Sequence, residues 1–580
     1  MVDATKMKFT LYKRWFHPLL LLMWLLVGIG LRLTNLTAKP PWTDEFSTLV
    51  FSLGNSFLGV PLDQAIAPDV LLQPLQPQPG VGINEVWKHL STESNHPALY
   101  FVLSHWWMQL FPTQNGLVSL WGARSLSAIF GALSIPAIYA LSWLTYRSRL
   151  IAHLAAAIMS VSPYGIFLAQ EARHYTLAIL WVIASLACLV IATRQIETRT
   201  QLPMAIAMIW VLINALGIAS HYFFALTLCT EAVVLIFLAW RQWGQGYREK
   251  FAPPLPHLLH SPWWRIYTVI TATIVSGVVW LPVFLQNSYG DKLTDWIQAP
   301  RVGFAWISPL FQAFAAWVTM QFLLPVESPY LAIVLVSGFV MLIYFIWLLP
   351  ILYRGIKVQL QQPETGLMST VFGLVVVSAI ALFFIFTYFL GIDLTRGARY
   401  NFVYFPAFII LFAVSLAICW QTPKVRLIKV SGSKAVIIIL LMGFASAITV
   451  LNNLGYQKYY RPDLFVELIQ KTSQAPVLIA TTQRTHVHIG EMMGVAREFK
   501  IKNSTYPTPL FLLAHQDQNP DTSSQALQKT LKALPQPLDL WLVNFFAPQP
   551  ESVKKCVADT QSLPSINGYE YKLYHCGLNK

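Results

Sequence analysis

Residues 19–45 read LLLLMWLLVGIGLRLTNLTAKPPWTDE, a long apolar run followed by two adjacent carboxylates, Asp44 and Glu45. A run of this length can cross about 30 Å of hydrocarbon as a helix. It follows a basic N-terminus that includes Lys13 and Arg14, and no small-residue cleavage site interrupts it. The stretch therefore predicts an uncleaved membrane anchor that starts in the cytoplasm and ends at an acidic pair near the opposite surface.

The composition extends this pattern to the whole chain. Of its 580 residues, 55% are hydrophobic and only 11% are charged, whereas about a quarter of the residues in a soluble domain are charged. The net charge of +14 comes from Lys and Arg scattered through short loops, which reflects membrane topology rather than a stripe that binds nucleic acid. We expect a polytopic helical protein in a lipid bilayer, with no nucleic-acid partner.

Thirteen apolar segments are candidate membrane helices. They lie near residues 18–36, 97–111, 119–145, 150–169, 174–193, 203–221, 223–240, 266–286, 304–324, 329–352, 367–390, 400–420 and 434–452. If all thirteen crossed, basic loops such as the one containing Arg147 would lie outside, against the positive-inside rule. Segment 97–111 is short, and segment 304–324 is interrupted by glutamines. We predict 11 to 13 transmembrane helices and favour eleven, with these two segments interfacial or re-entrant.

The eleven-helix topology separates basic loops from acidic or mixed ones. The outer segments are then residues 38–96, the QEARHY turn at 170–175, the SHYFF turn at 220–224, residues 287–303 and residues 391–399. The N-terminus would be cytoplasmic, and everything after residue 453 would be extracytoplasmic. We therefore expect a multi-pass protein of a plasma or inner membrane.

The composition changes after residue 453. Residues 454–580 are polar and rich in proline, with strand-like runs such as APVLIATT and LDLWLVNFF and the helix-like HIGEMMGVAREF. They predict a small extracytoplasmic α/β domain behind a membrane domain that covers residues 1–453 and includes the outer loop 38–96. In an oxidising compartment, Cys556 and Cys576 are more consistent with a disulfide than with two free thiols.

Polar residues that are far apart in the sequence gather on the predicted outer face. They are Asp44, Glu45, Glu93, Asn95, His96, Glu171, Arg173, His174, His221, Tyr222, Asp291, Lys292, Asp295, Asp393, Arg396, Arg399 and Tyr400. Ionisable groups at membrane depth are costly, so their convergence indicates a functional site. A carboxylate there can accept a proton from a hydroxyl group, and arginines can bind a phosphate and stabilise its charge as it leaves.

The order of several short motifs resembles glycosyltransferase family 39, which includes protein O-mannosyltransferases and lipid A aminoarabinose transferases. The motifs are the DE pair, NHPALYFVLSHWWMQLF, GARSLSAIFGALSIPAIYAL, SPYGIFLAQEARHYTLAIL, ASHYFFAL and RGARYNFVYFPAF, and the similarity covers residues 17–415. The resemblance implies a GT-C membrane fold and an inverting transfer of a sugar from a polyprenyl-phosphate donor on the outer face. The tail from residue 454 carries no such motif.

The resemblance also implies roles for individual residues. Asp44 corresponds to the first-loop aspartate that acts as the base or orients the acceptor, with Glu45 beside it in the catalytic site. Arg173 and Arg399 correspond to arginines that contact phosphate or sugar. The further substrate-binding candidates are His96, His174, His221, Tyr222, Arg396 and Tyr400. The sequence departs from the family at Ala98, where a second proline is usual, and at His96, where aminoarabinose transferases have lysine.

These residues also admit purely structural roles. Glu45 could only cap or orient the helix that follows it, and Arg173 and Arg399 could be interfacial arginines that extend to water. A histidine such as His221 at a helix end could simply satisfy a carbonyl.

A cofactor is not indicated by the sequence. Glu93, His96 and His221 have side chains that suit zinc, so a divalent metal is possible, but their spacing matches no established ligand pattern.

Two other functions would also use a charged outer face. A transporter or flippase of a lipid-linked glycan would be expected to carry charges at mid-membrane and paired broken helices, whereas here the charges gather at one face. A structural subunit could retain the fold without the chemistry, but the DE pair and both arginines are present. We therefore predict a glycosyltransferase that uses a polyprenyl-phosphate sugar, with a protein, lipid or polysaccharide acceptor.

Overall fold

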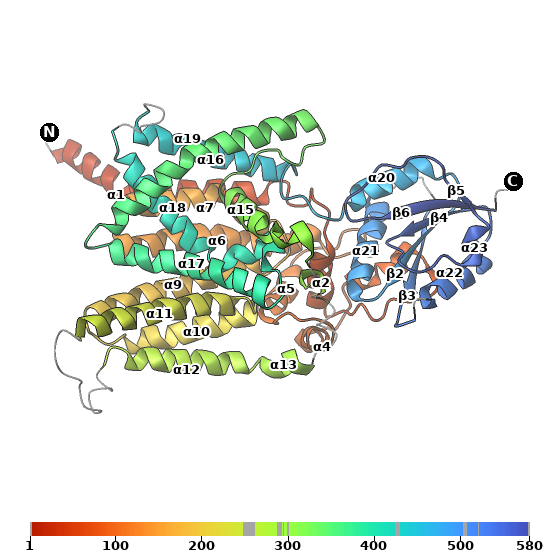
Figure 1. The fold of residues 1–580 in the computed structure, drawn as a ribbon, viewed down its shortest axis with the longest axis horizontal. Helices are drawn as coiled ribbons and strands as arrows, with labels where there is room; N and C mark the ends of the chain where they lie inside the picture. Colours follow the sequence, from red (N-terminus) through yellow and green to blue (C-terminus); the bar gives the residue numbers. More distant parts are fainter. Residues whose placement is uncertain are drawn as a thin grey trace.

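Long apolar helices form the body of the protein, and a small α/β domain lies against one end of them (Figure 1). The computed structural model describes residues 3–246, 261–286, 293, 295–298, 301–423, 430–502, 507–519 and 521–577. The helices of the bundle are α1 (Asp3–Leu33), α6 (Leu120–Tyr146), α7 (Arg149–Val161), α8 (Pro163–Ala169), α9 (Tyr175–Glu197), α10 (Met204–Ser220), α11 (Phe224–Gly246), α12 (Trp264–Val278), α13 (Leu281–Gln286), α16 (Leu331–Leu360), α17 (Gly366–Phe389), α18 (Phe405–Trp420) and α19 (Gly432–Leu451).

Within the described residues, eight helices are long and apolar enough to cross a membrane. A ninth crossing results if α7 and α8, which are bent by 55° at their junction, form one span. The bend falls at Pro163, because proline disfavours helical geometry in the residue before it. The shorter apolar helices α10 and α18 complete the eleven segments that the sequence favours. The prediction of a polytopic helical fold is confirmed.

The two segments expected not to cross form short helices. They are α5 (Leu99–Met108) and α15 (Ser308–Gln321). Neither belongs to the set of candidate spans. Both lie towards the end of the bundle that faces the α/β domain (Figure 1).

The turns between helices separate into two groups at opposite ends of the bundle. Near the α/β domain, the rings of His174 and His221 lie 4.5 Å apart, so the QEARHY and SHYFF turns meet there. At the other end, Arg194 donates a hydrogen bond of 2.9 Å to the Thr145 carbonyl, which joins the basic ends of α9 and α6. The QEARHY and SHYFF turns therefore lie at one end of the bundle, and the basic ends of α6 and α9 lie at the other.

The C-terminal domain is built on a six-stranded sheet in the order β1-β3-β2-β4-β6-β5. The strands β2 (Val477–Gln483), β3 (Leu510–His515) and β4 (Leu538–Val543) are parallel, and β6 (Tyr571–Cys576) and β5 (Val557–Ala558) are antiparallel. The helices are α20 (Pro462–Thr472), α21 (His486–Ile501), α22 (Thr522–Ala533) and α23 (Glu551–Lys554). Cys556 and Cys576 form a disulfide that ties β5 to the end of β6.

The first outer loop is part of the same folded unit as this domain. Its elements are α2 (Thr43–Ser52), β1 (Ala65–Ile66), α3 (Pro68–Leu71), η1 (Gln73–Leu75) and α4 (Ile83–Glu93). Strand β1 pairs with β3 and forms the edge of the sheet. Phe46 of α2 lies over Gly490 and Gly494 of α21, where a Cβ on either glycine would be in van der Waals contact with it. Loop and tail thus share one hydrophobic core.

We expect Phe46→Ala to lower the free energy of unfolding by about 3–5 kcal/mol, because the truncation opens a cavity between α2 and α21. Denaturant-induced unfolding of the solubilised protein, followed by circular dichroism, measures the change. Leu58→Ala is the matched control in the same loop, since Leu58 is 70% exposed. Equal stability of the two variants would contradict the shared core.

Candidate active site

A cavity of about 310 Å³ lies between the end of the bundle and the α/β domain. Its polar walls come from α2, the loop before α5, the QEARHY turn, the end of α10, the 3-10 helix η6 (Ala398–Val403) and the first turn of α21. Apolar side chains line another part of the wall, among them Phe386, Ile392 and Leu394. One cavity therefore collects groups from five of the predicted outer segments together with the C-terminal domain.

Asp44 lies in this cavity between two arginines. Its side chain, in the first turn of α2, is 29% exposed. Its Oδ2 atom is 3.7 Å from Nη2 of Arg173 and 3.6 Å from Nη2 of Arg399. Both distances exceed those of short charge-assisted hydrogen bonds, which are about 2.7–2.9 Å. A ligand can therefore approach this carboxylate and both guanidinium groups without first breaking a tight pair.

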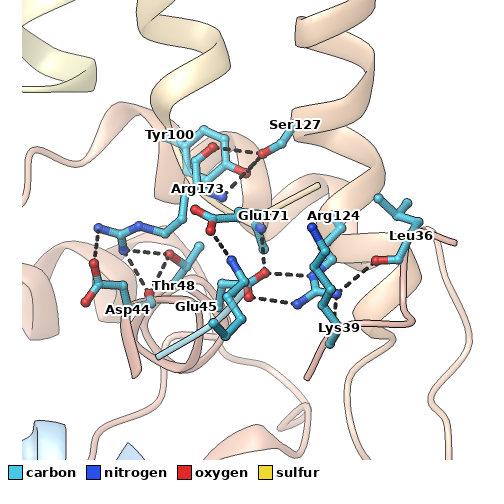
Figure 2. Close-up of polar contacts among 12 residues, drawn as sticks. Leu36, Lys39, Asp44, Glu45, Thr48, Tyr100, Arg124, Ser127, Glu171 and Arg173 are labelled. Carbon is cyan, nitrogen blue, oxygen red and sulfur yellow. Dashed lines mark hydrogen bonds and ion pairs between the residues drawn. The ribbon is translucent and has the colours of Figure 1, made fainter. Parts of the chain in front are cut away.

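Arg173 is almost completely buried, and its position is fixed by several contacts. Its Nη1 atom donates to the Asp44 carbonyl at 2.8 Å and to the Thr48 hydroxyl at 3.0 Å, as Figure 2 shows. Its Nη2 atom lies 2.9 Å from Nε2 of His96. Since a guanidinium can only donate, His96 accepts through Nε2 and carries its proton on Nδ1, 3.1 Å from the Ser94 hydroxyl.

His96 is held in the neutral state by its surroundings. Burial lowers the pKa of His96 well below its usual value, and the positive charge of Arg173 lowers it further. The ring therefore orients Arg173 through an accepted hydrogen bond while it lines the cavity.

Arg399 is positioned by aromatic rings. Its guanidinium lies 4.7 Å from the ring centre of Trp42, 5.1 Å from Trp296 and 5.2 Å from Tyr400. Such cation–π contacts hold the charge in place without using its N–H donors. The Nε–H group of Arg399 has no hydrogen-bond partner among the described residues, so Arg399 retains donor capacity for an anionic ligand.

Glu45 follows Asp44 in α2, but its side chain lies outside the cavity that Asp44 lines. It is fully buried, and its two oxygens accept hydrogen bonds of 2.8 Å from Nε and Nη2 of Arg124 (Figure 2). The Ala172 N–H donates to it at 2.8 Å, and Arg124 also donates to the carbonyls of Leu36 and Lys39. Glu45 does not line the cavity, so the expectation that it shares the catalytic site with Asp44 does not fit this geometry.

The remaining predicted residues divide between the cavity and its surroundings. His221, Tyr222 and Tyr400 line the cavity, as do His96 and both arginines. His174 lies behind the wall, fully buried and packed against His221. Arg396 pairs with Asp393 at 3.4 Å outside the cavity. Asp291 and Lys292 lie outside the described residues, and so does the side chain of Asp295.

The C-terminal domain supplies a cavity residue that the sequence did not indicate. His486, the first residue of α21, lines the wall. Its ring stacks on Phe57 at 4.9 Å. Burial lowers the pKa of His486 to about 4, although the charge of Asp44 acts in the opposite direction. Only the docking of α21 against the first outer loop brings this ring to the site.

A second buried ion pair fastens the linker between the two parts of the chain. Lys458, which follows α19, pairs with Glu171 of the QEARHY turn. The Lys458 ammonium also lies 5.4 Å from the ring centre of Trp42. The Arg399 guanidinium makes a cation–π contact with the same ring. The linker is therefore tied to the same turn that presents Arg173.

Across the described ranges, no three His, Cys, Asp or Glu side chains are arranged so that they could hold a metal ion.

No protein-family model matches the sequence, and no curated protein sequence matches it significantly. Among solved structures, ArnT from Cupriavidus metallidurans bound to undecaprenyl phosphate is similar over 96% of this chain and 97% of its own, at 12% identity and a TM-score of 0.45. The Archaeoglobus fulgidus oligosaccharyltransferase tethered to an acceptor peptide is similar over 92% and 70%, at 12% identity and a TM-score of 0.44. Similarities at this level assign neither a family nor an activity.

We expect Glu45→Gln to lower the free energy of unfolding by about 3–5 kcal/mol, because it leaves the buried Arg124 charge uncompensated. Burial alone would raise the pKa of Glu45, but Arg124 outweighs burial and lowers it from 4.5 to about 2. The pair therefore stabilises the protein above about pH 4.5, and this contribution is lost as the pH falls towards 2.

Denaturant-induced unfolding at several pH values measures both effects. Asp44→Asn is the matched control one residue away, and a much smaller loss is expected because Asp44 is partly exposed and loosely paired. A Glu45→Gln variant as stable as the wild type at pH 7 would show that the pair does not hold α2 in place.

Proposed function

We propose that this protein is a membrane glycosyltransferase of the GT-C type that transfers a sugar from a polyprenyl-phosphate donor to an acceptor hydroxyl. The observation that carries the proposal is the position of Asp44 between Arg173 and Arg399 in a cavity at the end of a membrane helix bundle. A carboxylate and two arginines at membrane depth supply both a base and a phosphate site. The motif order that resembles glycosyltransferase family 39 supports the same reaction.

The chemistry follows from the charges of the three groups. Asp44 accepts the proton of the acceptor hydroxyl, and the oxygen attacks C1 of the sugar from the face opposite the phosphate. The bond between C1 and the phosphate oxygen breaks, so the configuration at C1 inverts and polyprenyl phosphate leaves. Arg173 and Arg399 stabilise the negative charge that develops on the leaving phosphate. Because the two arginines outnumber Asp44, the site has a net positive charge that suits an anionic donor.

The surroundings of the cavity fit a donor with a lipid tail. Phe386 belongs to the last turn of α17, and Ile392 and Leu394 follow that helix. These apolar side chains extend the cavity wall towards the membrane-spanning part of the bundle. A polyprenyl chain would leave the site along this wall while its phosphate meets the arginines.

Glu45 and His96 act in this proposal as positioning residues. Glu45 fixes α2 to the bundle through Arg124, and neutral His96 fixes the direction of the Arg173 guanidinium. His221, Tyr222 and Tyr400 would contact the sugar or the acceptor from the cavity wall. The acceptor itself, whether protein, lipid or polysaccharide, would enter beside the α/β domain, where His486 lies.

The alternative function, transport or flipping of a lipid-linked glycan, is less well supported. The arginines and Asp44 lie at one end of the bundle, whereas a transport pathway would place its binding groups near the midplane.

Replacement of Asp44 by Asn is expected to lower sugar transfer by about 10²–10⁴-fold, because the acceptor hydroxyl loses its base. The measurement is release of free polyprenyl phosphate from a panel of polyprenyl-phosphate sugars by protein in lipid nanodiscs. Asp69→Asn is the control, since this aspartate of the same loop is 75% exposed and pairs with Lys500 away from the cavity. Wild-type turnover in a folded Asp44→Asn protein would rule out the base assignment.

The proposed orientation, with a cytoplasmic N-terminus and an extracytoplasmic α/β domain, can be tested by cysteine labelling. The background is Cys229→Ala, because Cys229 is the exposed one of the free cysteines. An impermeant maleimide should label Gln561→Cys in intact cells and Thr200→Cys only after the membrane is opened. The reverse pattern would invert the topology and place the cavity in the cytoplasm.

A further inference from the structure

A second cavity, of about 420 Å³, lies within the α/β domain. Its lining includes Asn544 and Phe546, which follow β4, and His488 and Glu491 of α21, the helix that follows the neighbouring parallel strand β2. From β2 the chain passes through α21 to β3 on one side, and from β3 it passes through α22 to β4 on the other side of β2. The strand order therefore reverses between β2 and β4. In open α/β sheets, this switch point is where ligands bind.

The floor of the cavity is a fixed polar network. Asn544 follows β4 in the left-handed region, with φ of 48°. Its side-chain nitrogen donates to the Gly568 carbonyl at 3.0 Å and to Glu491 at 3.3 Å, and its oxygen accepts from the Glu570 N–H at 2.9 Å. The Tyr460 hydroxyl donates to the other oxygen of Glu491. Tyr460, Asn544 and the segment 568–570 are thus joined around the buried carboxyl group of Glu491.

The rim of the cavity carries exposed aromatic rings. Tyr459 is 69% exposed and Phe546 is 56% exposed, although the rest of the domain has an ordinary buried core. The backbone of Phe546 is tied to β2, because its N–H donates to the Thr482 hydroxyl at 3.0 Å. Aromatic faces that stay in water beside a polar floor are typical of a site that stacks a flat ligand face.

The charge of the lining restricts the chemistry of the ligand. The lining contains no lysine or arginine, so it does not suit a phosphate or another anion. Both oxygens of Glu491 accept hydrogen bonds, from Tyr460 and Asn544, and the exposed Glu570 adds a second carboxylate to the lining. His488, Asn567 and Ser565 add neutral polar groups to the wall. A molecule with many hydroxyl groups can donate hydrogen bonds to these acceptors.

We propose that this cavity is a carbohydrate-binding site, in which a neutral sugar ring stacks on Tyr459 and Phe546 and its hydroxyl groups bond to the polar floor around Glu491 and Asn544. The proposal concerns binding alone and does not depend on the glycosyl transfer proposed for the first cavity. The two cavities are nevertheless neighbours, because the first turn of α21 presents His486 to one and His488 to the other.

The test is binding of maltose, cellobiose and lactose to the full-length protein by saturation-transfer NMR and titration. Lipid nanodiscs are required, since maltoside detergents would compete for the site. We expect at least one of these neutral disaccharides to bind at millimolar concentration. Tyr459→Ala and Phe546→Ala should each weaken binding by about ten-fold, as the loss of one aromatic contact implies. Both residues are exposed, so both variants should fold.

Two control variants distinguish the possible results. Ile501→Ala removes an exposed apolar side chain of the same domain outside this cavity and should leave binding unchanged. Asp44→Asn should also bind normally, so failure of the transferase proposal would not affect this one. The proposal is overturned if no disaccharide binds the wild type, if the rim variants bind as well as Ile501→Ala, or if choline binds at this cavity and the sugars do not.

Discussion

The buried pair between Glu45 and Arg124 is the interaction on which the rest of the site depends. Two charges in a protein interior are tolerated only when each is fully satisfied, and here the carboxylate accepts three hydrogen bonds while the guanidinium also caps two carbonyls. The pair fixes α2 to α6 and to the QEARHY turn. Since the opposite side of α2 packs on α21, this short helix joins the membrane bundle to the α/β domain.

The different surroundings of Asp44 and Glu45 follow from their adjacent positions on α2. Successive residues of a helix point about 100° apart, so one carboxylate enters the protein interior and the other enters the cavity. Glu45 is fully buried and tightly paired, whereas Asp44 stays partly exposed and loosely paired between Arg173 and Arg399. Tight pairing holds the helix, and loose pairing leaves a partly exposed carboxylate in the cavity.

The α/β domain completes the first cavity and carries a second one. Its helix α21 supplies His486 to the wall beside Asp44, and the ion pair between Lys458 and Glu171 keeps the linker against the QEARHY turn. The polar cavity beside the end of β4 is lined by His488, from the first turn of the same helix. A single element therefore borders both cavities.

Hydrophobic periodicity and composition are local properties, so the amino-acid sequence was enough to predict the membrane class and the strands and helix of the tail. Motif order also selected Asp44, Arg173 and Arg399, which the fold brings together. Packing between distant elements buries Glu45, leaves His174 and Arg396 outside the cavity, and brings His486 into its wall. These outcomes depend on which faces of distant helices pack together, and no local pattern of residues encodes that choice.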